Sequence, residues 1–298
     1  MKTYLVGGAV RDKLLGLPIS ERDWVVVGAT KEEMLDRGFR QVGREFPVFL
    51  HPESNEEYAL ARTERKTEPG HRGFQCRSDP DVTLEEDLGR RDLRINAIAE
   101  TETGTLIDPH DGLGDIKRRS IRHISESFKE DPLRILRVAR FKAKFHHLNF
   151  SIRQSTTELV KAMVANNEHT EVSAERILME LDKALITKTP AEFFRYLTKV
   201  SADSTLWPEI SRAAYGRLDS SSVVNPDAKF AVLLLDLSPA EIQKICRRLK
   251  TSKNRLEVTT LITTLINNWS DVEKLSPEAR VDLVEKADGI RKHERFNN

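Results

Sequence analysis

The pattern of apolar residues changes near residue 125, and this change limits the fold of the 298-residue chain more than any other feature. Before it, apolar residues form short runs typical of strands, such as Tyr4–Val6 and Trp24–Val27, separated by turns and short helices. Beyond it, the signals are almost all helical. The sequence therefore predicts an α+β fold, with an α/β head and a small mixed sheet at 1–125, a helical neck at 126–210 and a helical body at 211–298.

Local start and stop signals place the individual elements. The predicted helices cover Ala9–Leu15, Lys31–Arg37 after the cap Thr30, a segment opened by the Thr83–Glu86 capping box, and Ala174–Ile186 after Ser173. The predicted strands include Phe46–Leu50, Tyr58–Ala61 and a hairpin of Ile95–Glu100 with Thr105–Ile107. A capping residue followed by proline, which is a helix-start signal, recurs at Asp131, Thr189, Ser238 and Ser276.

Charge and cysteine content restrict the classes of function. The formal net charge is +1, so any residues that bind RNA must be gathered locally. Cys76 and Cys246 lie far apart without zinc-site spacing, and two free thiols are expected. The N-terminus lacks a signal-peptide core, and no apolar run approaches the roughly 20 residues that span a bilayer. These features predict a cytoplasmic protein without a membrane partner.

Two groups in the head are suited to phosphate. Gly7 and Gly8 precede Arg11, and glycines allow close approach to an anion to which a guanidinium adds charge. Arg91 and Asn96 are suited to phosphate and ribose hydroxyls respectively. The alternatives are a simple tight turn for the glycines and a basic surface turn for the second group.

An acidic group lies between these two phosphate-binding candidates in the sequence. Glu21 and Asp23 begin the second predicted strand, where alternation points both side chains the same way. Adjacent carboxylates repel each other unless a cation lies between them, and oxygen ligands suit Mg²⁺, which also binds triphosphates. Glu57, near another strand, is a candidate third carboxylate. The alternative is a solvated turn that carries charges.

An arginine stripe follows on the helix that begins at Asp131. At helical spacing Arg134, Arg137, Arg140 and Lys144 share one face. Neighbouring like charges repel, so the stripe favours an anion opposite it, such as a triphosphate or an RNA backbone. The alternatives are a solvated helix face and, for Asp131, a simple N-cap.

These groups, in this order, carry a resemblance to one family. The matching motifs are LVGGAVRD, RDWVVVG, EYALARTERK, RRDLRINA, IDPHDGLGD, EDPLRILRVARF and SAERI. With them, residues 1 to about 210 closely resemble the tRNA nucleotidyltransferases of the bacterial and eukaryotic class, the CCA-adding enzymes. The resemblance implies a nucleotidyltransferase head that adds and repairs the 3′-terminal CCA of tRNA with CTP and ATP, by two-metal phosphoryl transfer that releases pyrophosphate.

The resemblance also implies a role for each matching residue. Two Mg²⁺ ions are implied at Glu21 and Asp23, with Glu57 as a further acidic residue near the reaction centre. The implied nucleotide contacts are Gly8, Arg11, Arg91 and Asn96 around the incoming nucleotide, Asp131 and Arg134 as a protein template for the base, and Arg137 and Arg140 for phosphates. The implied partner is tRNA, and the chain is expected to act as a monomer.

The sequence departs from the family pattern at two places. The family's metal pair is usually Asp-x-Asp, whereas Glu21 is the first member here, and catalytic geometry is sensitive at the ångström scale. Phe230–Pro239 resembles an HD phosphohydrolase helix in which Leu235 stands where histidine is expected, so metal-dependent hydrolysis is not predicted. The basic stretch Arg247–Arg255 is a candidate tRNA contact or a solvated helix face.

The segment Thr67–Pro80 predicts a loop, because it collects glycine, proline and polar residues without periodicity. CC-adding relatives lack this loop, so its presence favours ATP use, and the resemblance suggests a lever between C and A addition. A-adding and CC-adding enzymes and poly(A) polymerases share the catalytic head and stay open as alternatives. So does a non-catalytic tRNA-binding relative whose metal site decayed at Glu21.

Overall fold

The computed structural model describes residues 1–42, 48–66, 74–269, 276, 277 and 279. The chain divides into two units, Met1–Arg134 with Leu148–Met163, and Ile135–His147 with Val164–Asn298. The first unit holds a mixed sheet with helices and the described part of the second is helical, which confirms the predicted α+β class. The functional segments 1–125, 126–210 and 211–298 stay a prediction.

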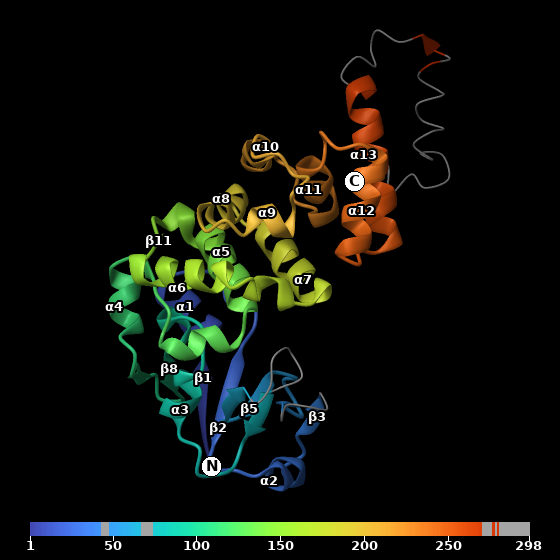
Figure 1. The fold of residues 1–298 in the computed structure, drawn as a ribbon. Coiled ribbons are helices and arrows are strands. Elements are labelled where there is room, and N and C mark those ends of the chain that lie inside the picture. Colours follow the sequence, from blue (N-terminus) through green and yellow to red (C-terminus); the bar gives the residue numbers. More distant parts are fainter. Residues whose placement is uncertain (43–47, 67–73, 270–275, 278, 280–298) are drawn as a thin grey trace. The chain divides into compact units, whose positions relative to one another are not determined.

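Seven strands of the first unit form one sheet in the order β3-β4-β5-β2-β1-β8-β9. They are β1 Lys2–Val6, β2 Asp23–Val27, β3 Arg40–Val42, β4 Val48–Leu50, β5 Glu57–Leu60, β8 Ala99–Thr101 and β9 Leu106–Ile107. Two further pairs are β6 Thr63–Lys66 with β7 Phe74–Arg77, and β10 Ser120–Ile121 with β11 Ser151–Ile152. Figure 1 shows β1, β2 and β5 side by side; β1 and β2 are antiparallel, and β2 and β5 are parallel.

Helices cover both faces of this sheet. The helices of the first unit are α1 Gly8–Leu14, α2 Lys31–Asp36, α3 Leu84–Gly89, α4 Gly112–Lys117 and most of α6 Gln154–Ala165. Because side chains alternate along a strand, Val25 and Val26 of β2 face opposite sides. Val25 belongs to a buried cluster with Leu88 of α3, whereas Val26 belongs to one with Met34 of α2. The strand is therefore buried on both sides.

Several local predictions are confirmed in the first unit. The predicted helix Ala9–Leu15 corresponds to α1, and the predicted strand Tyr58–Ala61 corresponds to β5. Thr30 and Thr83 both close capping boxes, in which the hydroxyl accepts a main-chain N–H and a glutamate side chain accepts the N–H of the cap residue. These signals succeed because each depends only on residues three positions apart.

Other local predictions are wrong. Phe74–Arg77 pairs with β6 as a strand where a loop is predicted, and residues 67–73 of that predicted loop lie outside the described residues. The hairpin predicted for Ile95–Glu100 with Thr105–Ile107 forms between β8 and β9, but Ile95 and Asn96 lie in a 3-10 turn and not in its first strand. The reason is local, because the Asn96 side chain donates to Asp92 while its N–H donates to the Leu93 carbonyl.

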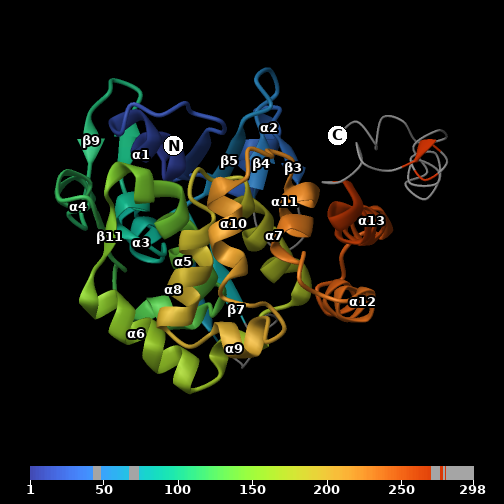
Figure 2. The same ribbon diagram turned by 90° about the horizontal axis from the view of Figure 1, so that it is seen from above.

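The described part of the second unit is a series of helices. They are α5 Leu133–Phe145, whose first two residues belong to the first unit, α7 Ala174–Leu185, α8 Ala191–Lys199, α9 Asp203–Leu206, α10 Ala214–Ser220, α11 Pro226–Leu233, α12 Pro239–Arg248 and α13 Lys253–Trp269. α10 packs against α8 and α11, and α13 packs against α11 and α12 (Figure 2). No helix among the described residues combines the length and hydrophobicity that crossing a membrane requires.

The proline-based helix starts have mixed outcomes. Ser238 closes a capping box with Glu241 and confirms the start of α12. Thr189 does not cap α8, which begins at Ala191, because its hydroxyl donates instead to the Ala143 carbonyl of α5 at 2.8 Å. Ser173 stands at the predicted start of α7 but makes no side-chain cap.

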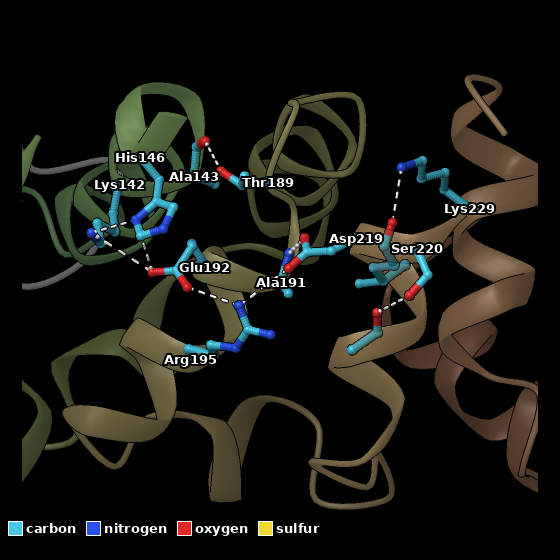
Figure 3. A network of polar contacts seen from close by, with 12 residues as sticks. Lys142, Ala143, His146, Thr189, Ala191, Glu192, Arg195, Asp219, Ser220 and Lys229 are labelled. Atoms are coloured by element: carbon cyan, nitrogen blue, oxygen red, sulfur yellow. Dashed lines mark hydrogen bonds and ion pairs between the residues drawn. The ribbon is translucent and has the colours of Figure 1, made fainter. Parts of the chain in front are cut away.

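A chain of polar contacts ties α5 to α8 and α10 (Figure 3). Lys142 of α5 and His146, which directly follows α5, contact each other at 2.8 Å, and His146 lies 3.4 Å from the Glu192 carboxylate of α8. Arg195 donates to Glu192 at 2.8 Å and to Asp219 of α10 at 3.2 Å. Such partly exposed pairs contribute at most about 1 kcal/mol each. Together they orient α5, the helix that carries the arginine stripe.

Arginines of the C-terminal basic stretch are paired inside the second unit. Arg248 donates to both carboxylate oxygens of Glu209, at 2.8 and 2.9 Å, and these hydrogen bonds lower the pKa of Glu209 to about 2. Arg255 is buried between Asp182 and Asp227. These contacts favour a structural role for the two side chains over a tRNA contact.

Two glycines give a matched test of packing. A Cβ on Gly112 would overlap the Arg94 carbonyl oxygen, whereas a Cβ on Gly216 of α10 would meet no atom within 4 Å. We expect Gly112→Ala to lower the free energy of unfolding by about 1–3 kcal/mol because backbone must move. Gly216→Ala should raise it by up to about 1 kcal/mol through helix propensity. Urea denaturation measures both, and equal changes would contradict the packing described.

Candidate active site

The glycine turn after β1 lies against Arg91. Gly7 has a φ of 71°, a conformation that glycine adopts without strain, and its N–H donates to the Ile98 carbonyl at 3.2 Å. A Cβ on Gly7 would lie 2.8 Å from Nη1 of Arg91, so the guanidinium occupies the space that the missing side chain leaves. Gly8, the predicted nucleotide contact, is the first residue of α1.

Arg11 and Asn96 are bonded to each other. Arg11 Nη1 donates to Oδ1 of Asn96, and Arg11 Nε donates to Asp12 at 2.8 Å. The Asn96 amide donates to Asp92 at 2.9 Å. The Arg11 and Asn96 residues are only 4% and 6% exposed. The structure thus brings these two predicted contacts together in an internal network behind the glycine turn.

The parallel register of β2 and β5 places Asp23 opposite Glu57. Each is the first residue of its strand and is exposed. Alternation puts Asp23 on the same face of β2 as Val25, the face that α3 covers, and Arg91 follows α3 closely in the chain. The prediction that Glu21 lies on the strand is wrong, because β2 begins at Asp23.

The electrostatics of Asp23 reflect these neighbours. Crowding by protein atoms reduces the hydration of its carboxylate and raises its pKa above the ordinary value, although the side chain keeps contact with solvent. The Arg91 guanidinium opposes this rise in pKa, and the Glu21 carboxylate adds to it. Arg91 and Glu21 therefore both lie within electrostatic reach of Asp23.

The donor set at Asp23 fits a divalent cation. Carboxylate oxygens close to one another are donors that a hard cation stabilises. Glu21 and Asp23 supply such oxygens, and Glu57 lies opposite Asp23 in the sheet. Within the described residues, however, no three His, Cys, Asp or Glu side chains converge as a ready metal-binding group.

Asp131 and Arg134 lie together at the start of α5 in the first unit. The Asp131 carboxylate accepts the N–H of Leu133 at 3.1 Å, as an N-cap does. Arg134 is buried and donates to the carbonyls of Ser127, at 2.9 Å, and Arg90, at 2.5 Å. Arg134 is thereby tied to the segment that carries Arg91.

Arg137 and Arg140 belong to the second unit, where Glu180 of α7 meets them. Arg140 Nε lies 2.5 Å from one Glu180 oxygen and Arg137 Nη1 lies 3.8 Å from the other. The Glu180 side chain is fully buried, and the Arg140 guanidinium also lies 4.3 Å from the centre of the Phe141 ring. The anion that the stripe favours is thus partly supplied by the protein itself.

Comparisons with known proteins show which family the chain belongs to. The family model "Poly A polymerase head domain" matches residues 3–122, and "Probable RNA and SrmB- binding site of polymerase A" matches 149–213. A CCA-adding enzyme from Coxiella burnetii is 48% identical over 301 residues, which cover 100% of this chain and 80% of that protein. This chain belongs to the CCA-adding enzyme family.

Further relatives support this membership. A multifunctional CCA protein from Thioalkalivibrio sulfidiphilus is 60% identical over 212 residues, which cover 71% of this chain and 52% of that protein. A solved CCA-adding enzyme in complex with CTP has a TM-score of 0.66 and 25% identity, covering 92% of this chain and 68% of its own. As a family member the chain is a tRNA nucleotidyltransferase, and this superfamily generally uses divalent metal ions.

The two matched segments divide the candidate residues. The head model covers Gly8, Arg11, Glu21, Asp23, Glu57, Arg91 and Asn96. Asp131, Arg134, Arg137 and Arg140 lie between the two models, in the segment from 123 to 148. The head model therefore covers the candidate metal ligands, whereas the candidate base-selecting residues lie outside both models. The roles of the individual side chains remain proposals.

Sequence patterns alone miss two buried carboxylates that organise these arginines. Asp87 binds Arg90 at 2.8 Å and Arg91 at 3.2 Å. Its spacing of three and four residues before two arginines on a helix is a signal that could find it. Glu180 offers no such signal, because Arg140 lies 40 residues away along the chain.

The Glu180 contacts predict a large loss of stability on substitution. Glu180→Gln leaves the Arg140 guanidinium beside a neutral amide, and breaking a buried pair costs about 3–5 kcal/mol. The matched control is Glu175→Gln on the same helix, whose exposed pair with Lys250 contributes at most about 1 kcal/mol. Chemical denaturation compares the two variants. Similar losses in both would show that Glu180 is not the charge that holds α5 against α7.

Proposed function

We propose that this chain adds and repairs the 3′-terminal CCA of tRNA, using CTP and ATP and releasing pyrophosphate. One observation carries the proposal: the exposed carboxylates Asp23 and Glu57 lie opposite each other, and the Arg91 guanidinium at the glycine turn acts on Asp23. Such a site offers carboxylates for cations and a guanidinium for a triphosphate. Relatives with the same head are CCA-adding enzymes, one of them solved with CTP.

The proposed metal ligands are Glu21 and Asp23, for two Mg²⁺ ions, with Glu57 as a further acidic group. Bound ions supply activation of the tRNA 3′-hydroxyl and neutralise charge at the α-phosphate. Arg91 orients the phosphates from its place against the glycine turn, and Gly8 lets the nucleotide approach the main chain. These residues act by positioning and by charge, which are the main contributions that a protein makes to phosphoryl transfer.

Base selection is assigned to Asp131 and Arg134. A carboxylate and a guanidinium near each other offer the acceptors and donors that the Watson–Crick edge of C or A requires. The bonds from Arg134 to two main-chain carbonyls set the direction of its side chain before a base arrives. Arg11 is proposed to contact the incoming nucleotide, and Asn96, together with Arg91, to contact its sugar and phosphates. Within the second unit, phosphate contacts are proposed for Arg137 and Arg140.

The proposal includes the oligomeric state and the cellular location of the protein. We expect a monomer that acts in the cytoplasm, where tRNA is the partner. Light scattering on the full chain, alone and with one equivalent of tRNA, tests the monomer.

The activity is tested with tRNA transcripts that end before CCA or after CC, each given CTP, ATP or both with Mg²⁺. Gel sizing should show CC addition with CTP alone, A addition to the CC end with ATP alone, and full CCA with both. A product that stops at CC indicates a CC-adding enzyme, and extension of the CC end alone indicates an A-adding enzyme. Long A tails indicate a poly(A) polymerase, and no product indicates a non-catalytic relative.

The same assay tests the metal ligands. We expect Asp23→Ala to lower turnover at least about a hundredfold while tRNA binding persists, because the carboxylate holds metal rather than RNA. Glu21→Asp should keep or raise activity. The control is Asp36→Ala, an exposed aspartate of α2, which should leave turnover unchanged. Near-full Mg²⁺-dependent turnover of Asp23→Ala would show that the metal assignment is wrong.

Base selection has its own test at Arg134. We expect Arg134→Ala to increase incorporation of UTP or GTP relative to CTP by about tenfold to a hundredfold, because a polar partner of the base is lost. Single-nucleotide incorporation kinetics measure the ratio. If selectivity is unchanged and only the thermal midpoint falls, Arg134 serves solely to tie Ser127 and Arg90 together.

A further inference from the structure

Asp87 is a fully buried charge in α3. Its Oδ1 accepts hydrogen bonds from Nε and Nη2 of Arg90, at 3.0 and 2.8 Å, and from the N–H of Arg62 at 3.3 Å. Its Oδ2 accepts from Nη2 of Arg91 at 3.2 Å. Burial by itself would raise the pKa of Asp87, but the guanidiniums of Arg91 and Arg90 outweigh burial and lower it. The carboxylate is therefore ionised, and its side-chain partners are two guanidiniums, one of which is Arg91 of the candidate site.

The Arg91 guanidinium has one end on Asp87 and the other at the glycine turn. Asp87 accepts a hydrogen bond from Nη2, while Nη1 lies in the space beside Gly7. An arginine side chain without such a bond samples many rotamers, and few of them place its charge at the glycine turn. The bond to the buried Asp87 carboxylate restricts the Arg91 side chain to the position beside Gly7.

We propose that Asp87 is a positioning residue that holds Arg91 at the glycine turn, where its guanidinium can meet the phosphates of the nucleotide. The inference rests on the proposed function in one respect, that Arg91 contacts the incoming nucleotide. Asp87 itself does not touch the substrate. Its effect on nucleotide binding therefore passes through Arg91, and this dependence separates a positioning role from a general contribution to folding.

The test is calorimetric titration of the full chain with CTP and Mg²⁺. Asp87→Asn keeps the shape of the side chain but removes its charge, and we expect the Kd for CTP to rise about tenfold. The matched control is Asp115→Asn, another fully buried aspartate of the first unit, which pairs with Arg118 at 3.1 Å and Arg122 at 3.8 Å. Both variants lose a buried charge, but the Kd of the control should stay within about twofold of the wild-type value.

A double-mutant cycle with Arg91 shows whether Asp87 affects CTP binding through Arg91. In the Arg91→Ala background, Asp87→Asn should change the Kd for CTP less than about twofold, because the residue through which it acts is gone. The inference is overturned by an unchanged Kd in Asp87→Asn, by the same increase in the Arg91→Ala background, or by an equal increase in Asp115→Asn.

A conservative variant covers the case in which Asp87→Asn does not fold. Asp87→Glu keeps the charge but moves it. The folded variant should therefore show a Kd for CTP above the wild-type value and below the value predicted for Asp87→Asn. In the Arg91→Ala background, Asp87→Glu should leave the Kd nearly unchanged. An unchanged Kd in this folded variant overturns the inference. If the chain adds no nucleotide to tRNA yet binds CTP with the predicted coupling between Asp87 and Arg91, the proposed function fails and the inference stands. If the wild-type chain binds no CTP, the inference is overturned.

Discussion

The parallel pairing of β2 with β5 is the interaction on which the candidate site depends. A shift of one residue in this register would turn every side chain of the strand to the other face. Val25 would leave the cluster under α3, and Val26 would leave the cluster under α2. Burial of both clusters therefore fixes the register, and the register places Asp23 opposite Glu57, on the face of β2 that α3 covers. The apolar core thus determines the position of the acidic group.

Buried carboxylates complete the arrangement by fixing arginines. A buried charge is costly unless it is paired and hydrogen-bonded, so Asp87 and Glu180 are compatible with the fold only while their guanidinium partners stay in place. Asp87 holds Arg91 in the first unit, and Glu180 holds Arg140 in the second. Cationic side chains that would otherwise sample many rotamers are therefore oriented before any substrate binds, which reduces the entropy lost on binding.

The sequence predicts those features that depend on residues close together in the chain. The capping box at Thr83 is an example, because the spacing of three residues is itself the interaction. The sequence does not show which residues pair when they lie far apart in the chain. Phe74–Arg77 becomes a strand only because β6 lies beside it, and Glu180 becomes part of an ion pair only because Arg140 packs against it. The resemblance of motifs identifies Asp23 as a site residue, but only the strand register shows which carboxylate lies opposite it.

The central claim is that the acidic group at the start of β2 holds the divalent cation of a nucleotidyl transfer site. The direct measurement is anomalous diffraction from crystals of the full chain soaked with Mn²⁺ and CTP. The account predicts Mn²⁺ peaks within coordination distance of the Glu21 and Asp23 carboxylates, and loss of these peaks in Asp23→Ala. Mn²⁺ bound elsewhere, or bound equally well in Asp23→Ala, would contradict it.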